Sequence, residues 1–374
     1  MQRIGKKQIP YGLSKEEAIL KLKSETFNRI TVSLYKYIVI NNTREMHERL
    51  FSTWERLDCL GRIYIASEGI NAQMSVPEHN WDQFKSELYT ISEFNNVPLK
   101  IGVHHNTSFH RLSVRIRKKI VADGLTLGNY DIENVGNHLT AGEFNKAMKD
   151  NNSIVVDMRN HYESEIGYFD GAITPQIDTF REGLPVVAAE LSGSENKKIL
   201  LYCTGGIRCE KASAYLKDKG FKDTNQLHGG IIDYKHQVER EGLENRFLGS
   251  NYVFDKRDPE KIGDIIISHC NQCKNKCDRH VNCVNYACNL LFLQCMHCKQ
   301  KMEMTCSTSC KEVINMPPEK LEIYYKIKGN SKKRFSKSLG ARKIFTKKSL
   351  LQKIKKIFSS KIIFIIKKSI TYFK

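Results

Sequence analysis

The segment 199–215 limits the fold and the chemistry of this 374-residue chain more than any other. Residues 199–202 are apolar and predict a short buried strand. Gly205 and Gly206 permit a tight turn, and a helix-forming composition follows. Cys203 is therefore expected at the end of a strand, just before a helix begins.

A cysteine in this position has the surroundings of a sulfur nucleophile. Free backbone N–H groups and the positive end of a helix dipole favour its thiolate form. Arg208, five residues after Cys203, adds a positive charge. The alternative is that Cys203 is a small buried hydrophobic residue, as many cysteines are. The glycine pair and the arginine favour the nucleophile.

The interval between Cys203 and Arg208 separates two kinds of cysteine chemistry. Cysteine phosphatases place the arginine one residue later, in a loop sized for phosphate. The shorter loop found here resembles the active-site loop of the rhodanese family, in which the cysteine holds a persulfide. Cys209 either resolves such a persulfide as a disulfide or packs beneath the helix. The loop is expected to consist of Thr204, Gly205, Gly206 and Ile207.

Residues 135–245 alternate between helix and strand patterns, which predicts an α/β domain with a parallel sheet. Ligands of such sheets bind beyond the C-terminal ends of the strands, where Cys203 is expected. The region resembles the rhodanese domain in its Asp-x-Arg pair with Glu163 downstream, its Gly-x-x-x-Gly-Ala-Ile segment, its cysteine loop and its Gly-Gly before a helix. We interpret Asp157 and Arg159 of the pair as structural.

Residues 31–125 show the element order β-α-β-β-α-β, which predicts a ferredoxin-like or acylphosphatase-like domain. A strand expected over 112–121 places Arg115, Arg117 and Lys119 on one face. Such a face can follow a phosphate backbone, so these residues are candidates for RNA binding. A solvated charged face is an equally common explanation.

Residues 264–318 contain nine cysteines with the spacing of metal ligands. In each of two Cys-x-x-Cys pairs both sulfurs can face one ion, and enough further ligands follow for two tetrahedral sites. We interpret the segment as a ribbon-like structural zinc module, with free or redox-active thiols as the alternative. Its candidate ligands, whose division between sites is left open, are Cys270, Cys273, Cys277, His280, Cys283, Cys288, Cys295, Cys298, Cys306 and Cys310.

The net charge of +19 is concentrated at the end of the chain. Sixteen of the 60 Lys and Arg residues lie in 328–374, which contains no Asp or Glu, so the first 327 residues have 44 basic and 41 acidic side chains. RNA binding by the body of the protein therefore depends on clustering of charge. The pattern of segment 328–374 is compatible with a basic amphipathic helix that contacts RNA or an acidic membrane surface. The alternative is a poorly ordered extension without a specific role.

Targeting signals and membrane spans are not expected. Residues 1–30, interpreted as an extension, lack the apolar core of a signal peptide, and the sequence has no run of about 18 apolar residues. We therefore expect a cytoplasmic protein. Its cysteines are expected to bind metal or to catalyse rather than to form disulfides.

Together these features resemble the bacterial tRNA uridine hydroxylase family over about 30–318. Further motifs that support the resemblance are Glu-Gly-Ile-Asn at 68–71, the basic segment 115–124 and Asn-Leu-Leu-Phe at 289–292. The resemblance implies oxygen-dependent hydroxylation at C5 of the wobble uridine, position 34 of tRNA, to 5-hydroxyuridine. It also implies tRNA as the partner, molecular oxygen as the co-substrate and Cys203 as the active-site cysteine.

The sequence does not identify the group that activates oxygen. Such chemistry normally uses a flavin or a redox metal, yet the chain has neither a Gly-x-Gly-x-x-Gly fingerprint nor a two-histidine, one-carboxylate set. One hypothesis is that the Cys203 thiolate adds to C6 of uracil and makes C5 electron-rich. Another is that the cysteine-rich module holds iron. A donor protein for sulfur or electrons fits this chemistry.

Two other classes of function fit the same residues. A rhodanese-type sulfurtransferase passes persulfide sulfur from Cys203 to cyanide or an acceptor thiol. A non-catalytic tRNA-binding protein uses only the basic strand and the metal module. Thiosulfate turnover without a change in tRNA modification favours the sulfurtransferase. Unchanged tRNA modification in a deletion strain favours the non-catalytic tRNA-binding protein.

Overall fold

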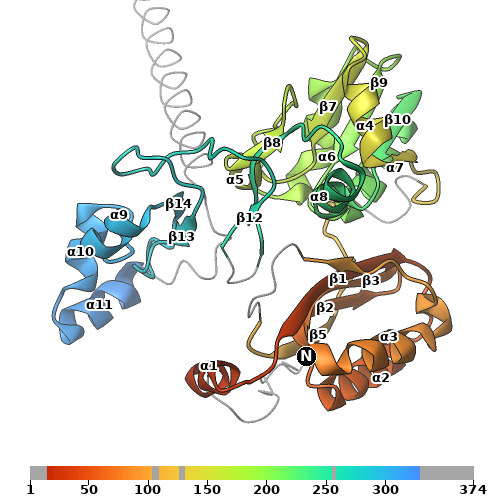
Figure 1. Ribbon diagram of the computed structural model, residues 1–374. Helices are drawn as coiled ribbons and strands as arrows, with labels where there is room; N and C mark the ends of the chain where they lie inside the picture. Colours follow the sequence, from red (N-terminus) through yellow and green to blue (C-terminus); the bar gives the residue numbers. More distant parts are fainter. Residues whose placement is uncertain (1–14, 103–108, 126–130, 255–257, 329–374) are drawn as a thin grey trace, which may run out of the picture. The chain divides into compact units, whose positions relative to one another are not determined.

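The chain forms two compact units. The first unit consists of Met1–Pro175 and Thr179–Ile266, and the second consists of Gln176–Asp178 and Ile267–Lys374. The computed structural model describes residues 15–102, 109–125, 131–254 and 258–328 (Figure 1). Residues 1–14 of the predicted extension and 329–374 of the basic segment lie outside the described residues. Over the described ranges, no helix is long and apolar enough to cross a membrane.

The N-terminal part of the first unit is built on a five-stranded sheet (Figure 1). Its elements are α1 Lys15–Lys23, β1 Arg29–Tyr37, α2 Thr43–Arg56, β2 Leu60–Ala66, β3 Gly69–Pro77, η1 Glu78–Asn80, α3 Trp81–Tyr89, η2 Ser92–Phe94, β4 Lys100–Ile101 and β5 Leu112–Ile116. The strand order is β4-β1-β3-β2-β5, in which β5 is parallel to β2 and the other neighbours are antiparallel. The predicted acylphosphatase-like architecture is therefore confirmed.

One face of this sheet is covered by α2 and α3. Leu50 and Trp54 of α2 and Phe84 of α3 are fully buried in one cluster with Leu34 and Ile63 of the strands. Because side chains alternate along a strand, the intervening residues point to the opposite face. That open face is polar and aromatic, and includes Ser33, Tyr35, Arg62, Tyr64, Asn71 and Gln73.

The second part of the first unit is an α/β domain with a parallel sheet. Its elements are β6 Asn137–Leu139, α4 Ala141–Met148, β7 Ser153–Asp157, α5 His161–Ser164, β8 Gly167–Phe169, α6 Phe180–Glu190, β9 Lys198–Tyr202, α7 Ile207–Asp218, β10 Asp223–Leu227, α8 Gly230–Glu241, β11 Phe247–Asn251 and β12 Glu260–Lys261. The parallel strands lie in the order β6-β10-β9-β7, and β12-β11-β8 form a small second sheet. The predicted parallel sheet is confirmed.

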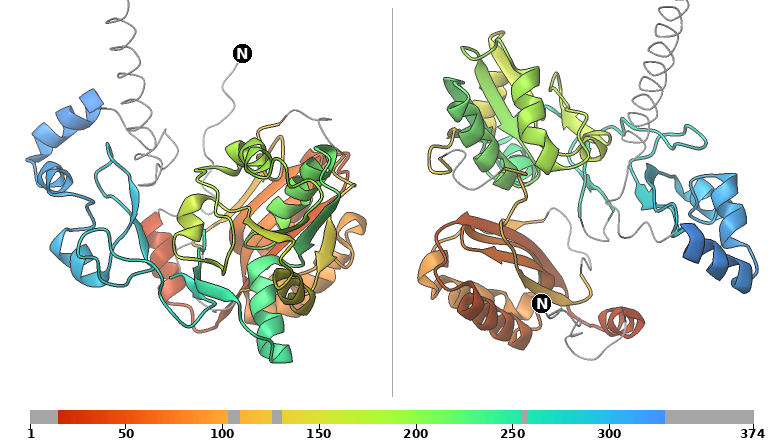
Figure 2. Two further views of the ribbon diagram at one scale, coloured as in Figure 1. Left: turned by 90° about the horizontal axis from the view of Figure 1, so that it is seen from above. Right: turned by 180° about the vertical axis from the view of Figure 1, so that it is seen from behind.

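Helices cover both faces of the parallel sheet (Figure 2). Ile199 and Leu201 of β9 pack in one cluster with α6 and α7, whereas Leu200 and Tyr202 pack in another with α4 and α8. A strand buried on both faces reads as a continuous apolar run. This explains why 199–202 is apolar at every position.

The second unit is small and is organised around cysteines. Its elements are β13 His280–Asn282, β14 Leu291–Leu293, α9 Met296–Lys301, α10 Thr308–Ile314 and α11 Pro318–Lys328. Two small clusters make up its interior, and both contain cysteines. So small an apolar core is typical of domains that are stabilised by bound metal.

The loop between β9 and α7 is shaped by glycines. Gly206 adopts a φ of +95°, which favours glycine. Gly230, at the start of α8, lies directly against the loop: the N–H of the next residue, Ile231, donates to the carbonyl of Cys203 at 3.0 Å. A Cβ on Gly230 would lie 2.6 Å from the Cys203 and Thr204 carbonyl oxygens, and Gly230 also has a φ of +69°.

We predict that Gly230→Ala destabilises the protein by about 1–3 kcal/mol, because the added methyl group meets backbone atoms that cannot rotate away. Chemical denaturation measures this change in the free energy of unfolding. Gly142→Ala in α4 is the matched control, since the nearest atom to its Cβ is 3.8 Å away. This control should be neutral or stabilising by about 0.5–1 kcal/mol. Equal stability of the two variants would contradict the prediction.

Candidate active site

Cys203 directly follows β9, and its side chain is fully buried. The backbone N–H of Gly206 donates a hydrogen bond to its Sγ at 3.1 Å. Burial by itself raises the pKa of Cys203, but the Cys209 thiol, the Arg208 guanidinium and the N–H groups of Arg208 and Gly206 outweigh burial and lower the pKa to about 5. The structure thus places Cys203 after a strand and before a helix, as the sequence predicts, in surroundings that favour a thiolate.

Cys209 is the thiol that faces Cys203 from the first turn of α7. It is fully buried, and burial together with its hydrogen bond to Cys203 raises its pKa well above the usual value. Cys209 therefore keeps its proton while Cys203 is ionised. This contact fits both predicted roles of Cys209, packing beneath the helix and resolving a persulfide.

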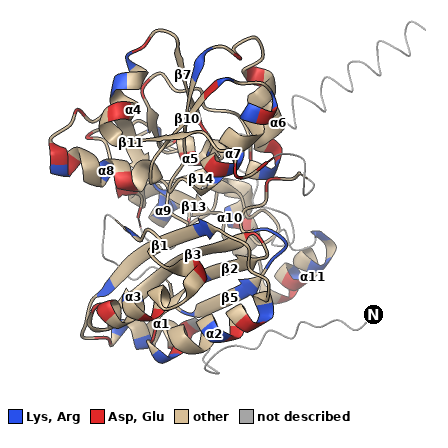
Figure 3. Ribbon diagram, turned by 90° about the vertical axis from the view of Figure 1, so that its right-hand side faces the viewer, with Lys and Arg blue, Asp and Glu red and all other residues tan. Residues whose placement is uncertain are grey.

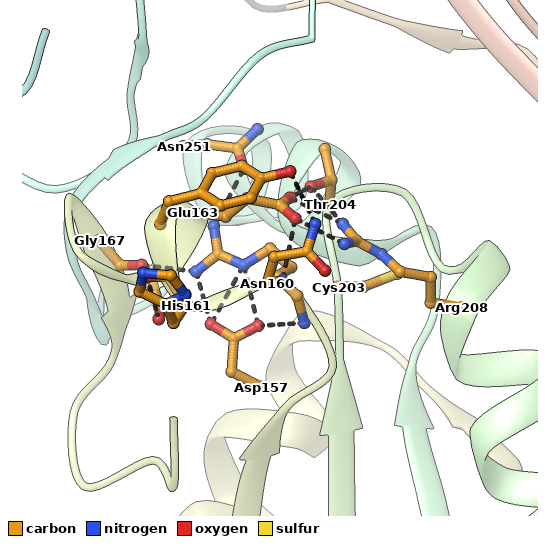
Figure 4. Close-up of polar contacts among 12 residues, drawn as sticks. Asp157, Asn160, His161, Glu163, Gly167, Cys203, Thr204, Arg208 and Asn251 are labelled. Atoms are coloured by element: carbon orange, nitrogen blue, oxygen red, sulfur yellow. Dashed lines mark hydrogen bonds and ion pairs between the residues drawn. The ribbon is translucent and has the colours of Figure 1, made fainter. Parts of the chain in front are cut away.

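The guanidinium of Arg208 is fixed by Glu163 (Figure 4). Its two Nη atoms donate to the two carboxylate oxygens at 2.7 and 2.8 Å, and Nη2 also donates to Thr204 Oγ1 at 3.2 Å. Burial raises the pKa of Glu163, but the neighbouring Arg208 lowers it below the usual value. Arg208 is thus a fixed positive charge beside the loop. In the sequence Glu163 is recognisable only as part of a motif, and its pairing with Arg208 was not predicted.

Asp157 and Arg159 form a second, fully buried ion pair (Figure 4). Arg159 Nη2 donates to Asp157 at 2.6 Å and to the Gly167 carbonyl at 2.5 Å, and Nη1 reaches Asn251 at 3.4 Å. The pair joins the ends of β7, β8 and β11. These contacts agree with the interpretation of both residues as structural.

A cavity of about 270 Å³ opens onto Cys203 and the open face of the five-stranded sheet. Thr204 and Gly205 of the loop form one wall with Ile207 and Arg208, and strands β1, β2 and β3 form another. Ile207, expected in the loop, is instead the first residue of α7. Besides Arg208, its aromatic and cationic lining residues are Tyr35, Tyr64, Phe109, Tyr252, Phe254, Arg62 and Lys100. A site shared between the two domains was not predicted, because the sequence patterns of each domain are local to it.

Lys100, in β4, is the residue of this cavity that most directly contacts the loop. Its Nζ donates to the carbonyl of Gly205 and lies 4.1 Å from the ring centroid of Tyr35. Burial lowers its pKa to about 8, and the negative charges of Cys203 and Glu210 oppose the shift. No local sequence pattern marks Lys100, because its role depends on the packing of one domain against the other.

Helix α7 is bonded to the neighbouring domain along its first turns. Tyr37 Oη donates to the Ile207 carbonyl at 3.2 Å, and Tyr35 Oη donates to Glu210 at 3.0 Å. The buried Lys211 ammonium pairs with Glu68 at 2.9 Å and with Asp123 at 3.1 Å. These bonds fix the helix, and hence the loop before it, against β1 and the segment after β5.

The predicted basic strand is shorter than expected. Strand β5 ends at Ile116, because its partner β2 ends at Ala66, so the expectation of a strand over 112–121 is wrong. Arg115 and Arg117 are exposed. Lys119 instead pairs with the fully buried Asp123 at 2.7 Å. Two of the three candidates for RNA binding thus lie on the surface, and the third joins the Lys211 network.

Eight cysteines of the second unit form two clusters, within each of which the sulfur atoms lie within 4.8 Å of one another. Four sulfurs at this separation can hold a metal ion in tetrahedral coordination. The first cluster is Cys270, Cys273, Cys295 and Cys298, and the second is Cys283, Cys288, Cys306 and Cys310.

The two clusters are interleaved along the chain, because cysteine pairs of one alternate with pairs of the other. Closing both sites therefore folds the whole segment 270–310. Cys277 and His280, which the sequence analysis counted among the candidate ligands, belong to neither cluster. Sequence spacing does not show which two cysteine pairs form one cluster, since any two of the pairs can share a metal ion.

Three family models match successive parts of the chain. Residues 29–120 match the UPF0176 acylphosphatase like domain, 140–237 match the Rhodanese-like domain, and 248–311 match the Rhodanase C-terminal model. The fold and the site thus define a rhodanese-domain protein with an acylphosphatase-like domain before it.

Curated relatives cover almost the whole of this arrangement. A tRNA uridine(34) hydroxylase of Leptospira interrogans is 54% identical over 88% of this chain and 89% of its own length. Two further relatives have the same name. The protein from Pectobacterium carotovorum is 43% identical over 88% of this chain and 93% of its own length. The protein from Hamiltonella defensa is 41% identical over 91% of this chain and 96% of its own length. The chain belongs to the tRNA uridine(34) hydroxylase family, which confirms the resemblance seen in the sequence.

We predict two bound metal ions per purified chain, measured by elemental mass spectrometry against protein concentration. Cys298→Ser should lower the content to one ion or fewer, because it removes one ligand of a four-sulfur cluster. Cys277→Ser is the matched control and should keep both ions, since Cys277 lies outside the clusters. Full metal content in Cys298→Ser would contradict this assignment.

Proposed function

We propose that this chain hydroxylates C5 of uridine 34 in tRNA and that Cys203 is the nucleophile. The observation behind the proposal is a cysteine with a lowered pKa that opens onto a cavity lined by aromatic rings and cations. The substrate is taken from the relatives, which are named tRNA uridine(34) hydroxylase.

The cavity suits a single base turned out of its stack. Enzymes that act on a base take it out of the stack, and aromatic side chains then hold it. The cavity volume of about 270 Å³ is close to the lower end of the roughly 300–1,000 Å³ of small-molecule sites. A lone uridine therefore fits it better than a helical segment of RNA.

The reaction begins when the Cys203 thiolate adds to C6 of the uracil ring. A sulfur–carbon bond forms, the C5–C6 double bond opens, and its electron pair is shared between C5 and O4. The Lys100 ammonium lines the same cavity and stabilises this negative charge. C5 thereby becomes the electron-rich atom that combines with oxygen.

The overall reaction takes up one molecule of oxygen, two electrons and two protons. One oxygen atom enters at C5 as a hydroxyl group, and the other leaves as water. Loss of the C5 proton and departure of the Cys203 thiolate from C6 restore the double bond. We propose a donor protein as the source of the two electrons.

A rhodanese-type sulfurtransferase is the second candidate function, because its active-site loop matches this one. That reaction needs a sulfur donor to reach Cys203 Sγ. Lys100 bonds the loop at Gly205, and the Tyr35 hydroxyl would lie 2.6 Å from a Cβ on Gly206, so the neighbouring domain covers the loop closely. This cover favours an inserted base over a bulky protein donor. A non-catalytic tRNA-binding protein would not need a cysteine with a lowered pKa, so the surroundings of Cys203 argue against that function.

For the two cysteine clusters we propose structural zinc. Four-sulfur sites without open positions are typical of structural zinc, whereas a catalytic metal keeps a position for water or substrate. The ions supply folding energy to a unit with little apolar core. On this proposal oxygen chemistry takes place at Cys203, and the predicted iron alternative would appear as iron in the same metal measurement.

We predict that Cys203→Ser abolishes 5-hydroxyuridine at position 34, because a serine hydroxyl is not ionised at neutral pH. Mass spectrometry of nucleosides from a deletion strain that expresses each variant measures this, with a loss of at least about 100-fold expected. Cys277→Ser is the control and should restore the modification. A full level of 5-hydroxyuridine with Cys203→Ser would refute the mechanism, and thiosulfate turnover by an enzyme that leaves tRNA unchanged would favour the sulfurtransferase.

The pH dependence of kcat/KM should be bell-shaped. Activity rises as Cys203 loses its proton near pH 5, and it falls as Lys100 loses its positive charge near pH 8. Lys100→Arg should move the alkaline limb upward, since arginine stays protonated. Lys100→Met should lower the rate below about pH 8 and remove the alkaline limb, since wild-type Lys100 is itself uncharged above that pH. An alkaline limb that is the same in Lys100→Arg and wild type would exclude Lys100 as its source.

A further inference from the structure

The open face of the five-stranded sheet carries two rows of polar and aromatic side chains. Residues that are paired across neighbouring strands share a face, so the strand register defines each row. The first row is Tyr35, Asn71, Tyr64 and Arg115, and the second is Ser33, Gln73, Arg62 and Ser113. Both rows run from β1, beside the cysteine loop, to β5 at the sheet edge.

These rows have the composition of a surface for single-stranded nucleic acid. Arg62 and Arg115 are exposed, and neither row contains an Asp or Glu. The guanidinium of Arg117, also exposed, lies 5.4 Å from the ring centroid of Tyr64. Figure 3 marks the basic positions on β2 and β5. Aromatic rings with arginines beside them stack bases and neutralise phosphates.

The rows are continuous with the cavity at Cys203. Tyr35, Asn71, Tyr64, Gln73 and Arg62 line that cavity together with the cysteine. From β1 to β5 there are three strand spacings, a distance of about 14 Å. A base in the cavity therefore has neighbouring nucleotides within reach of Tyr64 and Arg115.

We propose that this sheet face binds the anticodon-loop nucleotides next to the target uridine. Tyr64 stacks one of these bases, and Arg62, Arg115 and Arg117 pair with the adjacent phosphates. The inference rests on the proposed function, because it takes tRNA as the substrate. It goes further by naming the surface that selects an unpaired loop over a duplex, whose bases are already stacked.

The test measures binding of a fluorescent anticodon stem-loop in a Cys203→Ser background, so that turnover does not interfere. Tyr64→Ala should weaken binding about 5- to 100-fold, the range for loss of one stacked base, whereas Tyr64→Phe keeps the ring and should stay within about twofold. Arg115→Ala should lower affinity and reduce the salt dependence by about one ion. Arg44→Ala is the matched control, because Arg44 is an exposed arginine on α2, across the sheet.

The outcomes separate this surface from the proposed function. If Tyr64→Ala weakens binding of the stem-loop but the wild-type enzyme forms no 5-hydroxyuridine, the binding surface is supported and the proposed reaction is rejected. Hydroxylation with unchanged affinity and KM in Tyr64→Ala would reject the surface and leave the reaction standing. Equal weakening of stem-loop and duplex RNA by Tyr64→Ala would also overturn the proposal, since stacking requires unpaired bases.

Discussion

A thiolate buried at Cys203 requires hydrogen bonds and a fixed positive charge in place of the water that burial removes. The Gly206 N–H and the Cys209 thiol supply the hydrogen bonds, and Arg208 supplies the charge. A buried arginine would itself be costly without a partner, and Glu163 provides one through two hydrogen bonds. The chemistry of one sulfur atom thus depends on a chain of contacts that begins at α5.

The second condition for the site is a neighbouring domain that closes it. Lys100 bonds the cysteine loop, and Lys211 in the following helix pairs with carboxylates of the other domain. The cysteine loop therefore faces a sheet with aromatic and basic residues. The domain opposite the loop limits which molecules reach Cys203.

The cysteine-rich unit has a different physical basis. Its interior is built largely from cysteines, and its two clusters are interleaved along the chain. A metal ion bound at one cluster would therefore restrain the ligands of the other. Metal and folding are linked in such a unit, because the ligands lie close together only once the chain is folded.

Local patterns were enough to predict the two domain folds, the position of Cys203 and the cysteine-rich module. Apolar runs, glycine pairs and Cys-x-x-Cys spacing act within a few residues, so the amino-acid sequence alone determines them. Tertiary structure decided the rest: Lys100 in the cavity, Glu163 as the partner of Arg208, Lys119 in an ion pair and the exclusion of Cys277 from both clusters. Each of these depends on contacts between segments far apart in the chain, which leave no periodic signal in the sequence.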